Sequence, residues 1–168
     1  PGRPMGYLTP PGTNFEADVG SWVARTDQGE PYTDENAQAI VETLADYHSA
    51  YYIRADRPPA PLLLSSGFTD DLFSVDEVLR FANRTRKRFP EEPLAMMLGD
   101  FGHQRAANKP AERDELVRAI RRWFAEHVLG RGRAPRGVRA YVQTCPRSEP
   151  PGGPLRARSF AALSGRVV

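Results

Sequence analysis

Two short apolar segments constrain the fold of this 168-residue chain more than any other feature. Residues 62–66 and 94–98 are each typical of a buried strand, and helical periodicity predicts a helix over 75–89 between them. Two strands joined by a crossover helix of this length are expected to run parallel. The loops that follow the strands, 67–74 and 99–110, then leave from one edge of the sheet, which is where open α/β sheets bind ligands.

Helical spacing predicts two further helices, over residues 34–53 and 112–129. Asp34 is expected to cap the first of them. The expected buried faces are Ala37, Ile40, Val41, Leu44, Tyr47, His48 and Tyr51 in the first helix, and Leu116, Val117, Ile120, Trp123, Phe124 and Val128 in the second. Residues 1–33 are rich in Pro, Gly and Thr and show no sustained period, so no element is predicted there.

Two local patterns complete the expected organisation. Ser74 and Glu77 have the spacing of a capping box, which predicts the start of helix 75–89. Residues 138–144 alternate between apolar and polar side chains, as in a half-buried strand, and a Pro/Gly-rich linker follows them. The sequence therefore predicts an α/β fold class with a parallel sheet.

Composition excludes several classes of partner. The 23 Lys and Arg residues are interspersed with 21 Asp and Glu, so the net charge is only +2 and no basic stripe for nucleic acid is formed. No apolar run has the length of a membrane span. Cys145 stands alone, which excludes an intrachain disulfide and a Cys-pair metal site. The N-terminal segment lacks the layout of a signal peptide, and the sequence leaves a cytoplasmic and a secreted location equally open.

The strongest chemical candidate is a pair of side chains at the expected ligand edge. Asp70 follows the first strand after a Gly-Phe-Thr turn, and His103 lies in GDFGHQR after the second strand. Neighbouring strands lie about 4.8 Å apart, so a carboxylate and an imidazole on these loops can meet. A carboxylate bonded to one ring nitrogen leaves the other nitrogen free as a base. Gly102 would let the backbone bring His103 close.

The stretch GFTDDLF, followed by a helix, a strand and GDFGHQR, resembles the C-terminal β-α-β-α portion of an α/β-hydrolase fold. More narrowly, it is similar to the Xaa-Pro dipeptidyl-peptidase and cocaine-esterase-like serine hydrolases of bacteria. The resemblance covers most of residues 57–145 and implies that Asp70 is the triad acid and His103 the triad base, with no cofactor. It also implies a helical cap or lid in residues 1–56, and a linker and the start of a β jelly-roll domain in 146–168.

The resemblance implies a small-molecule ester or amide, or a short peptide with a Xaa-Pro bond, as the substrate. Four aromatic residues are candidates for the lining of its pocket, namely Trp22, Tyr47, Tyr51 and Phe68. Ordinary packing of a cap helix is the competing interpretation for each of the first three.

The sequence lacks the segment that carries the nucleophile in such an enzyme. No G-x-S-x-G segment occurs, and Ser65 and Ser66 precede the acid on its own strand, where they cannot form the nucleophile turn. We therefore expect this chain alone to be inactive. One alternative is a non-catalytic fragment that needs its missing half or a second copy of itself. The other is a divalent-metal phosphoesterase that uses Asp70, Asp100 and His103.

Overall fold

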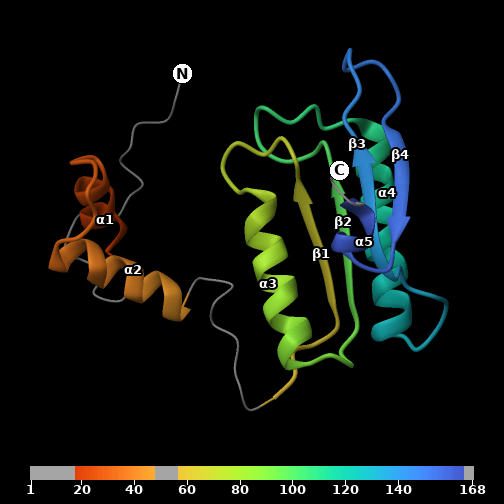
Figure 1. Cartoon of the computed structure of the whole chain (residues 1–168), viewed down its shortest axis with the longest axis horizontal. Coiled ribbons are helices and arrows are strands. Elements are labelled where there is room, and N and C mark those ends of the chain that lie inside the picture. The colour runs from red at the N-terminus through yellow and green to blue at the C-terminus, as the bar shows by residue number, and fades with distance from the viewer. Residues whose placement is uncertain (1–17, 48–56, 165–168) are drawn as a thin grey trace. The chain divides into compact units, whose positions relative to one another are not determined.

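The computed structural model of the chain describes residues 18–47 and 57–164, which belong to two compact units, residues 1–52 and 53–168 (Figure 1). The first unit contains α1 (Val19–Thr26) and α2 (Glu35–Tyr47). Asp34 caps α2 as predicted, because its carboxylate accepts the N–H of Ala37 at 3.0 Å. The predicted continuation of this helix over 48–53 lies outside the described residues.

Helix α1 is a correction to the sequence analysis, which expected no element within residues 1–33. Asp18 begins the helix, and its carboxylate accepts the N–H of Ser21 at 3.3 Å and the Ser21 hydroxyl at 2.7 Å. The helix has only 8 residues, so it offers about two turns in which a period could be recognised. A cap with a nearby serine was the signal available in the sequence.

The second unit is a four-stranded sheet with helices on both faces, which places it in the mixed α/β class (Figure 1). Its strands are β1 (Leu62–Gly67), β2 (Leu94–Gly99), β3 (Gly137–Val142) and β4 (Gly152–Ala157), and its helices are α3 (Val75–Arg88), α4 (Pro110–His127) and α5 (Phe160–Ser164). The strand order is β1-β2-β3-β4. The predicted parallel pairing of β1 with β2 is confirmed, β3 also runs parallel to β2, and β4 is antiparallel to β3.

The side chains of β2 alternate between two apolar layers. Met96 and Leu98 pack with α3 and α5, whereas Ala95 and Met97 belong to the layer under α4. Within the first layer the predicted inward residues of α3 are confirmed, since Val75, Val78, Leu79 and Ala82 all pack there. Because three consecutive parallel strands are joined by helices on opposite faces, the two crossovers have opposite hands.

Strand β1 is less buried than its apolar sequence predicts. Leu62, Leu63 and Leu64 are half-buried and Ser65 is exposed, whereas β2 is buried from Ala95 to its end. The reason is position, because β1 lies at an edge of the sheet and α3 covers one of its faces. Within the part of the chain that the structure describes, no strand pairs with its outer edge.

Two predicted details of the helices are wrong. The Ser74 side chain makes no capping bond, and the Glu77 carboxylate bonds Arg80 at 3.2 Å, one helical turn later. In α4 the buried face contains Glu112, Ala119 and Trp123. Four residues of its expected apolar face are exposed, namely Val117, Ile120, Phe124 and Val128. The sheet covers only the stripe of the helix that contains Leu116, Ala119 and Trp123, and these four residues lie beside it.

The C-terminal residues extend the same sheet. Strand β4 forms within the Pro/Gly-rich stretch that was expected to be a linker, and α5 follows it. The start of a jelly-roll domain in residues 146–168 therefore stays a prediction. Among residues 18–47 and 57–164, no helix combines the length and the apolar character that a membrane span requires.

Candidate active site

The pairing of β1 with β2 brings the two predicted loops together. Gly67 and Gly99 are partners at the ends of the two strands, and the Phe68 N–H donates to the Gly99 carbonyl at 2.8 Å. A Cβ atom on Gly67 would lie 1.6 Å from the carbonyl oxygen of Phe101. Only glycine allows the second loop to cross this closely over the end of β1.

Asp70 and His103 meet as the sequence predicts. His103 Nδ1 lies 2.8 Å from Asp70 Oδ1 and 3.0 Å from Oδ2. The Asp70 side chain is 9% exposed and the His103 side chain 44% exposed. Gly102 makes this contact possible, because its φ is +145° and a Cβ atom there would lie 2.4 Å from Asp70 Oδ2. The carboxylate thus lies beneath an imidazole that faces solvent.

Backbone groups hold the Asp70 carboxylate in its ionised form. Its Oδ1 accepts the N–H of Leu72 at 2.9 Å and that of Phe73 at 3.1 Å. These two bonds, with a smaller contribution from His103, lower the pKa of Asp70 to about 2. An ionised carboxylate can only accept, so Nδ1 of His103 must be the donor. The proton on Nδ1 leaves Nε2 with a free lone pair, which makes His103 a base.

Asn108 holds the loop that carries His103. Its side-chain Oδ1 accepts the N–H of Gly102 at 3.0 Å. Its Nδ2 donates to the carbonyls of Gly102 at 3.1 Å, His103 at 3.3 Å and Ala106 at 3.2 Å. The residue has a left-handed φ of 52°, which asparagine tolerates better than most side chains. The loop is therefore tied across its base, although the sequence analysis did not identify this residue.

The aromatic candidates divide between the two units. Phe68 lies on the loop of Asp70 and is 49% exposed. Trp22 is half-buried in α1, and Tyr47 is the last residue of α2, both in the other unit. Tyr51 lies outside the described residues. Phe68 is therefore the candidate that shares a loop with Asp70.

Phe73 is an aromatic neighbour of His103 that was not among the predicted site residues. The ring of Phe73 lies 5.5 Å from the imidazole, centroid to centroid, and Phe73 is 64% exposed. Leu72, beside it, is 67% exposed. With Phe68, these side chains make the loop of the acid apolar on its solvent side. The available signal was the apolar pair that directly follows the two aspartates in GFTDDLF.

Two further carboxylates of these loops, Asp71 and Asp100, contact other groups. Asp71 Oδ2 faces Arg105 Nε at 3.9 Å, and Asp100 Oδ1 accepts the N–H of Ala107 at 2.9 Å. Across residues 18–47 and 57–164, no three His, Cys, Asp or Glu side chains gather as metal ligands would. The described geometry thus favours an acid–base pair over a metal centre.

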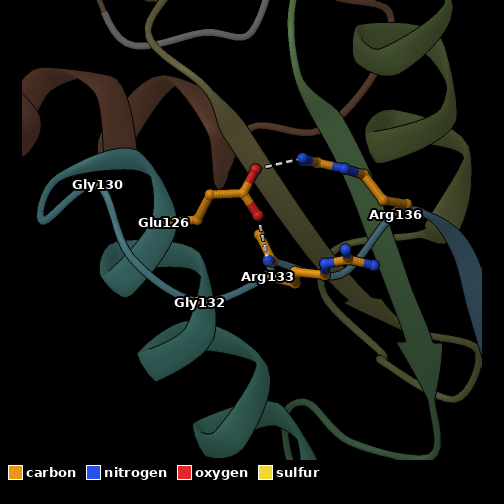
Figure 2. Close-up of a pocket in the computed structure, with 6 residues that line it drawn as sticks. Glu126, Gly130, Gly132, Arg133 and Arg136 are labelled. Carbon is orange, nitrogen blue, oxygen red and sulfur yellow. Dashed lines mark hydrogen bonds and ion pairs between the residues drawn. The ribbon is translucent and has the colours of Figure 1, made fainter.

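A separate hollow of about 550 Å³ lies between the end of α4 and the start of β3 (Figure 2). Glu126 reaches into it and bonds both the N–H of Ala134 and the guanidinium of Arg136. Helix α4 starts beside the loop of His103 and runs back along the sheet. This hollow therefore lies at the opposite ends of the strands from Asp70 and His103. It is not part of the candidate active site.

Comparisons with protein-family models, with curated proteins and with solved structures give no match to this chain.

Proposed function

We propose that this chain contributes the acid and the base of a serine hydrolase of the α/β-hydrolase type, which acts on ester or amide bonds, Xaa-Pro bonds among them. The supporting observation is the contact of 2.8 Å between a buried carboxylate and a half-exposed imidazole, at the carboxyl edge of two parallel strands. The resemblance of GFTDDLF and GDFGHQR to the acid and base loops of these enzymes supports the same assignment.

In this function His103 Nε2 takes the proton of an attacking hydroxyl while the hydroxyl oxygen bonds to the substrate carbonyl carbon. Asp70 stabilises the imidazolium that forms and remains ionised. The imidazolium then gives the proton to the leaving alcohol or amine, and water repeats the sequence on the acyl group. Among the described residues no hydroxyl bonds Nε2, and we propose that the nucleophile comes from outside them.

The first test is hydrolysis of a p-nitrophenyl ester by the purified chain, alone and together with a polypeptide that carries a G-x-S-x-G segment encoded upstream. We expect no turnover by the chain alone and turnover by the combination. In the combination, His103→Ala should lower kcat by about 10² to 10⁴. Asp70→Asn should lower kcat by up to about 10⁴, because the amide no longer favours the proton on Nδ1 of His103 and no longer stabilises the charge of the imidazolium.

Asp71→Asn is the matched control, because Asp71 is the neighbouring carboxylate and its Oδ2 lies 3.9 Å from Nε of the exposed Arg105. It should leave kcat within about twofold. Turnover by the chain alone that His103→Ala abolishes would show that the nucleophile lies within it. Turnover by the combination that His103→Ala leaves unchanged would disprove the assignment of the base.

A partner-dependent module without catalysis is the second candidate, and the outer edge of β1 is the observation that favours it. The backbone groups on that edge have no strand partner among the described residues, and Leu62, Leu63 and Leu64 are only half-buried. Such an edge pairs readily with another chain. Gel filtration and thermal unfolding together test this candidate. A monomer that unfolds cooperatively would argue against dependence on a partner, whether a second copy or a missing half.

A further inference from the structure

Asp100 is a buried side chain that contacts both loops of the candidate active site. Its Oδ1 accepts the hydroxyl of Thr69, the residue before Asp70. The same oxygen accepts the N–H of Ala107, on the loop of His103, at 2.9 Å. Asp100 itself is only 1% exposed. One carboxylate oxygen therefore joins the loop of the acid to the loop of the base.

The backbone of Asp100 is fixed as firmly as its side chain. Its N–H donates to Glu112 Oε2 at 2.7 Å, and Glu112 is fully buried on α4. Its carbonyl accepts the N–H of Asn108 at 2.9 Å. Asn108 in turn bonds the carbonyl of His103. A continuous chain of hydrogen bonds thus runs from α4 through Asp100 to His103.

This arrangement is unfavourable for stability. The second oxygen of Asp100, Oδ2, is buried, and so is Glu112 Oε1, and neither has a hydrogen-bond partner among the described residues. An unsatisfied buried carboxylate oxygen costs free energy that an apolar side chain in the same place would not. Violations of this kind concentrate where function requires a defined geometry.

We propose that Asp100 is a positioning residue, which holds Thr69 and the loop of His103 so that the Asp70 carboxylate meets His103 Nδ1. The chemical meaning of this inference rests on the proposed function, but the geometry itself does not. Displacement of a reacting group by about 1 Å can cost on the order of 10² in rate. In this proposal Asp100 therefore maintains the contact of 2.8 Å between Asp70 and His103.

The test measures the two neutral forms of the His103 ring by nitrogen NMR in the purified chain, at a pH where the ring is uncharged. The bond to Asp70 favours the form protonated on Nδ1. Thr69→Val removes only the hydroxyl, and we expect it to lower the ratio of the Nδ1–H to the Nε2–H form by about tenfold, the effect of weakening one charge-assisted bond. Asp100→Ala should lower the ratio at least as far.

Two conservative variants serve as controls. Thr69→Ser keeps the hydroxyl and Asp100→Asn keeps an acceptor oxygen, so each should retain the ratio of the parent chain. Hydrogen exchange of the β2 amides shows whether each variant is folded. If Asp100→Ala does not fold, the result for Thr69→Val alone decides the test. An unchanged ratio in Thr69→Val, or a parent chain with mainly the Nε2–H form, would overturn the inference. Failure of the proposed function is seen separately, as absence of hydrolysis in the combined enzyme.

Discussion

The two units each contain an aspartate bonded to a basic side chain, and the two pairs are buried in opposite ways. In the first unit the Arg25 side chain is 9% exposed and the Asp34 side chain 46% exposed. In the second unit the acid is the buried partner, with the Asp70 side chain 9% exposed and the His103 side chain 44% exposed. Which partner faces solvent determines what the pair can do.

Each side-chain nitrogen of Arg25 donates to a neighbouring group of the same unit. Its Nε donates to Asp34 Oδ2 at 3.0 Å, and its terminal nitrogens donate to the carbonyls of Gly29 at 3.1 Å and Pro31 at 3.0 Å. The Arg25 guanidinium also lies 5.2 Å from the centre of the Tyr32 ring. Such a pair joins α1 to the start of α2, and its cation is the buried partner. His103, in contrast, keeps one nitrogen free and accessible, which is what an acid–base catalyst requires.

The largest expected difference between the pairs comes from glycine substitution beside each. Gly102→Ala puts a Cβ atom 2.4 Å from Asp70 Oδ2 at a φ of +145°, so Asp70 or the loop must move. Backbone strain and overpacking together predict a loss of about 2 to 6 kcal/mol and loss of the Nδ1–H form of His103. Hydrogen exchange of the β2 amides and nitrogen NMR of the ring measure the two effects.

Gly29→Ala is the matched substitution beside Arg25. Gly29 also has a positive φ, of +80°, but nothing lies within 4 Å of the added Cβ atom. Only the backbone term remains, about 1 to 2 kcal/mol, seen as faster exchange of the α2 amides. Equal losses for the two variants would show that the close approach of Gly102 to Asp70 is unimportant.

Removal of the basic partner should change the pKa of the two acids to different extents. The bond to Arg25 is the largest cause of the lowered pKa of Asp34, so Arg25→Ala should raise that pKa clearly. The pKa of Asp70, about 2, depends first on the N–H groups of Leu72 and Phe73. His103→Ala should therefore raise it only slightly. Carbon NMR titration of the carboxyl groups checks both, and similar increases would contradict this account of Asp70.

The smallest expected effects concern stability against pH, where Glu112 provides the contrast to Asp70. The pKa of Asp70 is lower in the folded chain, so its contribution to stability is present above the unfolded value of about 3.9 and is lost as the pH falls towards 2. Burial raises the pKa of Glu112, so stability falls as the pH rises from about 4.3 to the higher folded pKa. Chemical denaturation between pH 2 and 7 measures both slopes.

Two variants separate these slopes. Asp70→Asn should flatten the dependence of the unfolding free energy on pH below about pH 3.9. Glu112→Gln should flatten it above about pH 4.3, and it keeps an oxygen that can accept the N–H of Asp100. A steeper decline of stability with rising pH in Glu112→Gln than in the parent chain would contradict a raised pKa of the buried Glu112.

The contact between Asp70 and His103 could be predicted because it follows from topology. Two apolar segments joined by a helix fix which loops share an edge, and each loop offers one side chain of the right chemistry. The role of Asp100 could not be predicted, because its hydrogen bonds are to Thr69 and Glu112, which are separated from it in sequence. Strand β4 was missed because pairing with β3 outweighs its Gly-Pro composition.

The exposed side chains of α4 show the same limit. Val117, Ile120 and Phe124 repeat with helical spacing, so the pattern assigns them to the buried face. In the structure the line of contact runs through Ala119 and through Leu116 and Trp123, the two residues for which the pattern is confirmed. Periodicity shows that a face exists, but the width of the sheet determines how much of it is covered.

The two amides that bind Asp70 have a consequence for how an enzyme built on this pair would respond to acid. Because the N–H groups of Leu72 and Phe73 stabilise the negative charge more than the base does, the carboxylate would not share in the gain and loss of protons during turnover. On the acidic limb of a pH–rate profile, kcat/KM would then decline with the slope of a single ionisation, and the pair would not behave as a two-proton unit.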